Sequence, residues 1–346
     1  MGASQYARPN AAMRAMLGAL LAPQEKRALV AAPSLEDAMR RLRATPYGRD
    51  LAVAEAGGEL LPLEKALQRT LVGTYGRLIR TLEGAPRDLV EELLRHFEVD
   101  DIKAILRGLA TGAPAAKIRA LLVPLGRWER LPLERLLAAP SVAEAVRALG
   151  RLPYARPLGE ALPRYEAERS LFPLEVALDL DYFRRLWARL EALSGGDRVG
   201  AVRILGARYD VLNVTWLLRY KLTYRLSAQE IFNYTLPHGY RVDDGVIRRA
   251  TTAGDLAGLI AALPQPYRGL LAPLEGASLA HMEAALCRYL WHDARALLAG
   301  YPFQAGAILA YLHLKEAEVH DLVAILAGKR SGRPAAEIEA LLWSEL

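Results

Sequence analysis

The sequence has little of several features that mark common protein classes. Cys287 is its only cysteine, so no disulfide can form within the chain and a reducing compartment fits. Aromatic residues make up 7% of the chain and runs of β-branched residues are nearly absent, whereas alanine and leucine abound, which favours helices over strands. The first 21 residues hold no continuous apolar stretch and include Arg8 and Arg14, so we expect no signal peptide.

Motifs that carry chemistry are scarce as well. There is no Gly-x-Ser-x-Gly nucleophile motif, and the turn at 328–332 lacks the earlier glycine and the Ser or Thr after Lys329 that a phosphate-binding loop needs. The uncharged window at 296–314 contains Pro302 and two glycines, so we predict a loop and a buried helix rather than a membrane span. From these absences we expect a non-catalytic chain without a cofactor.

What the sequence does contain is a stretch that occurs three times. Residues 34–47, SLEDAMRRLRATPY, return at 141–154 and more loosely at 252–267. Each copy begins with Ser or Thr followed three residues later by an acid, which predicts a capped helix start, and it closes with Pro and Tyr, which predicts the helix end. The predicted caps are Ser34, Ser141 and Thr252. Apolar residues at offsets of three, four and seven predict one buried face per helix: Leu35, Ala38, Met39 and Leu42; Val142, Ala145, Val146 and Leu149; Ala253, Leu256, Ala257 and Ile260.

The rest of the chain follows a similar period. Three glutamates in similar apolar contexts and three further helix starts recur at nearly the same step as the repeated stretch: Glu64, Glu175 and Glu283; Asp101, Asn213 and Asp321. We therefore predict an all-α protein of three homologous helical-bundle modules, with an N-terminal entry helix at 1–23 and modules at 24–139 (including a linker), 140–239 and 240–346. Such modules could stack as an open solenoid or close about a pseudo-threefold axis, and the periodicity does not decide between the two.

Two acidic pairs and one histidine set are the candidates for a metal site. Asp100–Asp101 could hold magnesium, but Asp101 stands where a helix cap is expected; Asp243–Asp244 precedes a glycine in a loop and is expected to be solvated. The set 313–320 (His313, Glu316 and His320) could bind zinc from one helix face, but the helix start predicted at Asp321 indicates a break between helices there. We therefore predict no metal site.

The segment 219–225, RYKLTYR, is the best candidate for a surface that contacts a partner. Its polar and aromatic side chains are Arg219, Tyr220, Lys221, Tyr224 and Arg225. Arginine and tyrosine are enriched where proteins meet, although the same residues could equally lie at a bundle edge with their charged ends in water. The net charge of +6 also leaves open an arginine-rich scaffold that binds nucleic acid or another polyanion.

Several short stretches, in their order and spacing, resemble the C subunit of prokaryotic V/A-type ATPases, the family of the d subunit of eukaryotic V-ATPases. The resemblance spans essentially the whole chain. The stretches that carry it are Tyr6–Ala11 with Met13 and Arg14, Leu35–Ala38 with Pro46 and Tyr47, Tyr209–Val214 with Arg219 and Lys221, and Ser227–Ile231 with Pro237–Gly239. The sequence departs from the pattern at Pro9, where a helix former is expected, and at Ala327, where the other two copies have arginine.

The resemblance implies a funnel-shaped, pseudo-threefold protein on the cytoplasmic face of the membrane, peripheral to it and seated on the proteolipid rotor ring. It implies a non-catalytic central-stalk subunit, present in one copy per complex, that receives the central-axle subunits of the soluble ATPase head. Torque would pass through this subunit for ATP synthesis or ion pumping. On this interpretation no nucleic acid partner is expected, and contact with the membrane surface is made only through the ring.

Overall fold

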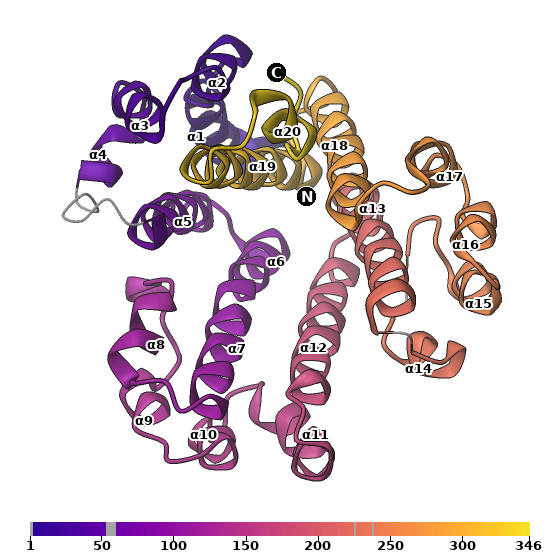
Figure 1. The fold of residues 1–346 in the computed structure, drawn as a ribbon. Helices are drawn as coiled ribbons and strands as arrows, with labels where there is room; N and C mark the ends of the chain where they lie inside the picture. Colours follow the sequence, from indigo (N-terminus) through magenta and orange to yellow (C-terminus); the bar gives the residue numbers. More distant parts are fainter. Residues whose placement is uncertain (1–2, 53–59, 225, 237–238) are drawn as a thin grey trace.

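The computed structural model describes residues 3–52, 60–224, 226–236 and 239–346 (Figure 1). Every regular element in these ranges is a helix and no strand occurs among them, which confirms the all-α prediction. Arg225, Pro237 and His238 lie outside the described residues.

Seven of the described helices form the central part of the molecule. They form three groups of helices that are consecutive in the sequence; in the first group α7 continues the course of α6 (Figure 1). They are α5 (Leu60–Ile79), α6 (Gly84–Leu94) and α7 (His96–Ala110); α12 (Phe172–Glu191) and α13 (Gly195–Arg219); α18 (Leu279–Leu298) and α19 (Ala305–Arg330).

Shorter helices gather in three lobes around this central part (Figure 1). The N-terminal lobe holds α1 (Ala7–Leu17), α2 (Pro23–Val30), α3 (Leu35–Arg43) and α4 (Gly48–Ala52). The second lobe holds α8 (Ala115–Leu121), α9 (Leu133–Leu137), α10 (Val142–Ala148) and α11 (Ala155–Glu168). The third lobe holds α14 (Ala228–Asn233), α15 (Asp244–Thr252), α16 (Leu256–Ala262) and α17 (Tyr267–Leu271), and α20 (Ala335–Ala340) closes the chain. Short 3-10 turns lie at Ala3–Tyr6, Gly126–Trp128 and Ala272–Leu274.

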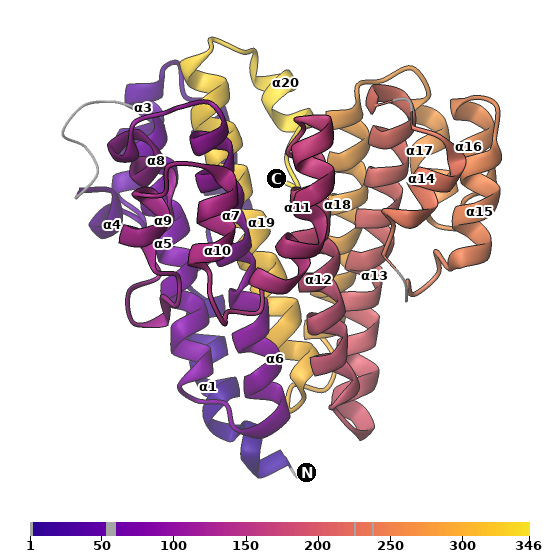
Figure 2. The same ribbon diagram turned by 90° about the horizontal axis from the view of Figure 1, so that it is seen from below.

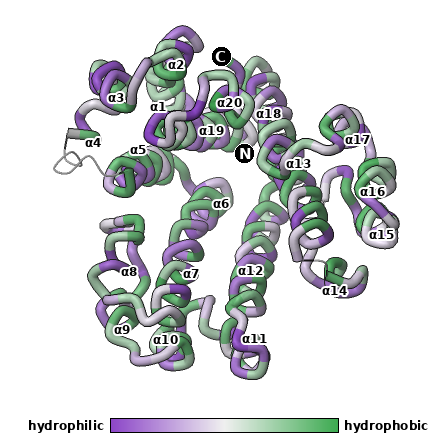
Figure 3. Tube along the Cα trace, viewed as in Figure 1, coloured by the Kyte–Doolittle hydropathy of each residue, from purple (hydrophilic) through white to green (hydrophobic). Residues whose placement is uncertain are grey.

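The most buried element is α19. Its residues are buried without interruption from Ala305 to Lys315, because α13, α18, α5, α3 and α1 all pack against it. Hydrophobic and hydrophilic residues alternate along most of the other helices, as expected where one face of a helix is buried and the other meets water (Figure 3). Figure 2 shows the long helices running side by side along the length of the molecule. No helix among the described residues is long and apolar enough to cross a membrane.

The predicted caps hold in the first two copies. The Ser34 hydroxyl accepts the amide of Asp37, and the Ser141 hydroxyl accepts the amide of Glu144. The apolar residues of both helices are buried, with only Leu35 partly exposed. Serine caps followed by an apolar face therefore account for α3 and α10.

In the third copy the predicted cap is wrong. Thr252 is the last residue of α15, and its hydroxyl donates back to the carbonyls of Arg248 and Arg249. The cap is Asp255, whose carboxylate accepts the amide of Gly258, and Leu259 and Ile260 are the buried residues that follow. The third copy is thus shifted by three residues, because aspartate caps a helix as well as threonine does.

The helix starts predicted at Asp101, Asn213 and Asp321 are also wrong. All three lie inside long helices, α7, α13 and α19, and all three are buried. Each side chain accepts a backbone amide 22 or 23 residues further on, at Val123, Leu236 and Trp343. Aspartate and asparagine, which commonly cap helices, here bind a backbone amide in the segment that follows the next short helix.

The entry helix is shorter than predicted. Within the predicted region 1–23 the helix runs only from Ala7 to Leu17, with Gly18 after its last residue. Pro9 lies in its first turn, where proline costs little because the first amides of a helix have no partner within the helix.

Candidate functional site

A buried tyrosine in each copy donates a hydrogen bond to an acid on a long helix of another copy: the preceding copy for the second and third, and the third copy for the first. We call these three contacts the tyrosine joints. The Tyr154 hydroxyl bonds Glu98 of α7, and the Tyr267 hydroxyl bonds Asp210 of α13 at 2.8 Å. The Tyr47 hydroxyl bonds Glu318 of α19 at 2.6 Å, across 271 residues of sequence. The first copy is therefore fastened to the last long helix of the chain.

The three acids of the joints have different partners. Glu98 is held by Arg95 at 2.7 Å and by Arg130 at 2.8 Å. Glu318 is held by Lys315 at 2.9 Å and by the amide of Leu21.

Asp210 has no basic side chain against it among the described residues. It accepts the backbone amides of Arg241 and Val242 in addition to Tyr267. Burial raises the pKa of Asp210, while these hydrogen bonds oppose that rise. The acid of the middle joint therefore has only neutral hydrogen-bond donors, whereas the acids of the other two joints also pair with a cationic side chain.

The predicted contact segment lies where α13 ends. The helix runs to Arg219 and continues as a π-helical turn, Tyr220–Tyr224. Tyr220 is buried among aromatic rings, with Phe172 at 5.8 Å and Tyr234 at 6.2 Å between ring centroids. Single-turn π-helices are rare and are frequent at functional sites.

A one-residue insertion explains this π-helical turn. In the first copy the amide of Ala113 returns to the carbonyl of Gly108, five residues back, and Arg333 returns to Gly328 in the same way. In the middle copy Leu226 returns to Tyr220, six residues back. The extra residue is taken up by the wider turn.

The segment turns part of its surface outward. Tyr224 is 52% exposed and Leu222 is 44% exposed. Lys221 is committed within the chain, because its ammonium donates to the carbonyl of Ala253 near the end of α15, and Arg219 pairs with Glu283 at 3.5 Å. The structure therefore brings Arg219, Tyr220, Lys221 and Tyr224 into one turn but presents chiefly Tyr224 to solvent.

Sequence reasoning did not find Leu222. The equivalent positions in the other two copies, Ala110 and Arg330, are exposed too, so Leu222 is an apolar residue at a position that faces water in all three copies. The sequence does carry a signal for the π-helical turn, namely the spacing to the next buried isoleucine. Arg219 stands one residue further from Ile231 than Arg107 stands from Ile118, and the third copy agrees with the first.

The acidic and histidine candidates have separate roles. Asp243 is not merely solvated but caps α15, accepting the amide of Val246 at 2.8 Å. His313, Glu316 and His320 all lie within α19, so the helix break expected between them is wrong.

Their side chains nevertheless take different partners. Glu316 accepts Tyr75 and Arg208, while His320 stacks on Trp343 with ring centroids 3.8 Å apart. Desolvation lowers the pKa of His313 to about 4. Within the described residues no group of three or more His, Cys, Asp or Glu could hold a metal ion.

The fold of the described residues is all-helical, and buried polar contacts such as the tyrosine joints tie together segments that lie far apart in the sequence. A model of the family described as ATP synthase (C/AC39) subunit matches residues 9–341, and the chain belongs to this family.

Curated relatives agree over nearly the full length. The chain is 30% identical to the C subunit of the A-type ATP synthase of Methanocaldococcus jannaschii over 98% of its own length and 86% of the relative's. It is 30% identical to the same subunit of Methanothermobacter thermautotrophicus, with 97% and 87% covered. It is 29% identical to that of Halorubrum lacusprofundi, with 96% and 95% covered.

Proposed function

We propose that this chain is a non-catalytic central-stalk subunit of a rotary ATPase or ATP synthase. It joins the central-axle subunits of the soluble head to the proteolipid ring and carries torque between them, one copy per complex, on the cytoplasmic face of the membrane. Support comes from the family and from relatives that are named as the C subunit of A-type ATP synthases.

The observation that carries this proposal is the set of buried bonds across the long helices. A torque-bearing part must resist shear between its helices. The Arg208 guanidinium of α13 donates to Glu316 of α19 at 2.7 Å, and Tyr75 of α5 donates to the same carboxylate. Nearer the start of α13, the backbones of α13 and α19 meet at two glycines, Gly200 and Gly306. A Cβ added to Gly306 would lie 2.8 Å from the Gly200 Cα. Such contacts oppose sliding of one helix along another.

We further propose that the three modules close about a pseudo-threefold axis as a funnel. The Tyr47–Glu318 joint supports closure over an open solenoid, because it fastens the first copy to the last. In an open stack the terminal copies would have no contact of this kind.

We propose the outward part of 219–224 as a partner contact, with Tyr224 and Leu222 as its apolar anchors and Arg219 as its charge. Arg225, which the sequence also predicts to contact a partner, lies outside the described residues. Lys221 and Tyr220 position this turn from within. Aromatic anchors of this exposure commonly carry a large share of binding energy in an interface.

The test is co-purification of the full chain with the detergent-solubilised ring and, separately, with the central-axle subunits. We expect one-to-one assemblies with both that survive about 0.5 M salt, since a shape-fitted apolar socket is weakly screened. A Leu222→Ser/Tyr224→Ser variant should bind one of these partners about tenfold or more weakly. The matched control replaces the exposed tyrosines elsewhere, Tyr240→Ser/Tyr301→Ser.

A chain that binds neither ring nor axle would overturn the coupling role. Equal loss in both double variants would overturn the contact proposed at 219–225 and leave the coupling role standing.

A further inference from the structure

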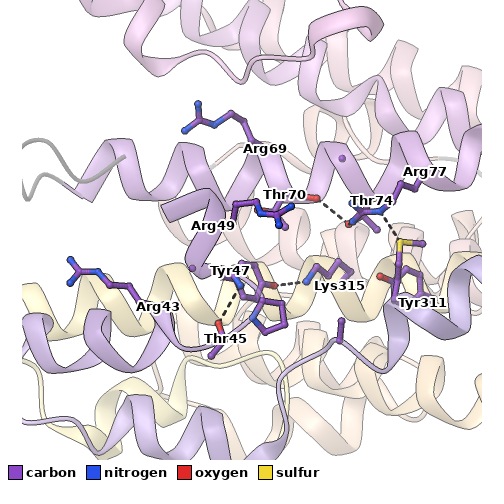
Figure 4. A pocket seen from close by; sticks show the side chains of 15 residues that line it. Arg43, Thr45, Tyr47, Arg49, Arg69, Thr70, Thr74, Arg77, Tyr311 and Lys315 are labelled. Atoms are coloured by element: carbon purple, nitrogen blue, oxygen red, sulfur yellow. Dashed lines mark hydrogen bonds between the residues drawn. The ribbon is translucent and has the colours of Figure 1, made fainter. Parts of the chain in front are cut away.

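A basic pocket lies between the N-terminal lobe and the central helices (Figure 4). It has a volume of about 530 Å³ and is formed by α1, the turn between α3 and α4, α5 and α19. Its described lining holds five cationic side chains and no carboxylate: Arg43, Arg49, Arg69, Arg77 and Lys315. We call it the arginine pocket.

Lys315 and Tyr47 form the inner end of the arginine pocket. The buried Lys315 ammonium donates to the Tyr47 hydroxyl at 2.6 Å and to Glu318 at 2.9 Å. The charge of Lys315 is therefore paired with Glu318, the acid of the tyrosine joint, and these hydrogen bonds hold this end of the pocket in place.

Three arginines of the pocket have no such ion pair with an acid among the described residues. Arg77 contacts the Met16 sulfur at 3.1 Å and the Thr74 hydroxyl at 3.3 Å. Neither Arg77 nor Arg49 nor Arg69 has a carboxylate partner among the described residues. In Figure 4, Arg49 reaches toward Thr70 and Arg77 comes from the other side, while Arg69 extends outward. Cations gathered in this way repel one another, and an anion between them removes that repulsion.

In the second copy, the arginine next to the tyrosine of the joint is paired with acids of the chain itself. Arg185 follows Thr74 by the same step that separates Glu175 from Glu64. Its guanidinium lies 5.1 Å from the centre of the Tyr154 ring, and it pairs with Asp181 at 2.8 Å and also with Glu92. There the chain supplies its own carboxylates. In the first copy threonines stand at both positions, Thr74 for Arg185 and Thr70 for Asp181. The cation over the joint tyrosine there is Lys315, which pairs with Glu318. The arginines around it are additional positive charges, and the described lining of the pocket holds no carboxylate to match them.

We propose that the arginine pocket binds a small inorganic phosphate anion, orthophosphate or pyrophosphate. Guanidinium groups match phosphate oxygens in pairs, and hydrogen bonds of this charge-assisted kind are the strong ones. The hydroxyls of Thr70 and Thr74 donate to backbone carbonyls of α5, so the arginines are the donors to the anion. Both tyrosines of the lining, Tyr47 and Tyr311, are only 1% exposed and offer no open ring face for a nucleobase. Recognition is therefore of the phosphate alone. The inference does not rest on the coupling role.

The test is isothermal titration of the full chain with sodium pyrophosphate at constant ionic strength. We expect one saturable site. The Arg49→Gln/Arg77→Gln variant should bind at least about tenfold more weakly, because each arginine lost removes a charge-assisted pair. The matched control, Arg41→Gln/Arg80→Gln, loses the same charge from exposed positions near the same elements, outside the pocket lining, and should keep the affinity within about twofold.

Absence of binding by the parent chain, or equal weakening in both double variants, would overturn the proposal. So would binding to phosphatidic acid vesicles without binding to free pyrophosphate. Should the double variant fail to fold, the single variant Arg49→Gln, at an exposed position, carries the same expectation with a smaller loss.

Discussion

The end of α13 differs from the ends of α7 and α19, although the three helices occupy the same place in the repeat. At the ends of α7 and α19 a glycine makes room for an isoleucine of the next short helix: a Cβ on Gly108 would lie 2.4 Å from Ile118, and one on Gly328 would lie 2.6 Å from Ile338. At the end of α13 the corresponding residue is Tyr220, and the chain widens into the π-helical turn. Two copies use this point to seat an isoleucine, and the middle copy fills it with the buried ring of Tyr220.

The same three helices also differ at their buried polar position. Asp321 has both carboxylate oxygens occupied, by the Trp343 amide and by Ser344 and Lys26. Asn213 uses its carbonyl and its amide on the backbone of Leu236. Asp101 has one oxygen on the Val123 amide and the other without a partner. The three equivalent positions thus differ in how well they are paired. Asp321 is a fully paired carboxylate, Asn213 is a neutral amide with both groups bonded, and Asp101 is a carboxylate with one oxygen unpaired.

Replacing Asp101 with asparagine should give the largest effect. Burial raises the pKa of Asp101 from 3.8 to about 7. The unfolded chain then loses this proton at lower pH than the folded one, so Asp101 lowers the free energy of unfolding as pH rises from about 4 to about 7. Asp101→Asn should raise that free energy by about 2–4 kcal/mol at pH 8 and by under about 1 kcal/mol at pH 4.5. Urea unfolding at both pH values measures this.

The matched variant in the third copy should have the opposite sign. Asp321→Asn leaves Lys26 buried without its counter-charge and should lower stability by about 3 kcal/mol at pH 8. Stabilisation by both variants would mean that the three copies do not differ in the way described.

Removing one hydroxyl from a tyrosine joint should come next. Tyr47→Phe removes one of the three donors to Glu318 and one of the two acceptors of Lys315, and both of these buried groups are charged. It should lower the free energy of unfolding by about 1.5–3 kcal/mol, because hydrogen bonds to charged groups are the stronger ones. Tyr267→Phe should cost about 1 kcal/mol, because two backbone amides still hold Asp210. Calorimetric melting of the two variants compares the joints. Equal costs would contradict a charged joint that is stronger than the neutral one.

The glycine contact at the end of α7 is tested by adding one methyl group. Gly108→Ala forces Ile118 to shift and should cost about 1–3 kcal/mol. Gly159→Ala in α11 has nothing within 4 Å of the new methyl and should gain about 0.5–1 kcal/mol. Urea midpoints of the two alanine variants should therefore move in opposite directions. A neutral Gly108→Ala would show that the isoleucine is loosely held.

The smallest effect is expected at the seam between α19 and α5. Arg107 pairs with Glu175 and Arg219 pairs with Glu283, but the third copy has Ala327 in place of the arginine, and Glu64 is the glutamate that corresponds to Glu175 and Glu283. Ala327→Arg should supply the missing pair and raise stability by under about 1 kcal/mol at low salt. The gain should vanish in about 1 M sodium chloride, where surface charges are screened. A gain that persists at high salt would come from packing of the arginine stem.

Local signals in the sequence found the helices, the caps of α3 and α10 and the repeat itself. They failed where residues of one chemical type have two uses. Asp101, Asn213 and Asp321 look like caps, and nothing in their neighbourhood of the sequence reveals that each accepts an amide beyond the next short helix.

The tyrosine joints were beyond sequence reasoning for the same reason. The closing Pro-Tyr of each copy was visible, but its acid partner lies on a helix of another copy. The contact segment at 219–225 was predicted from composition, yet its π-helical turn depends on a one-residue insertion that only a comparison of the three helix ends explains.

The joint between Tyr47 and Glu318 also fixes the order in which the molecule can be completed. A ribosome releases Tyr47 early, whereas its acceptor on α19 emerges 271 residues later. Until then the N-terminal lobe has no α19 to dock on, and its apolar face stays exposed. The lobe made first is therefore the last to be secured. A chain cut short before α19 loses the anchor of its beginning together with its end.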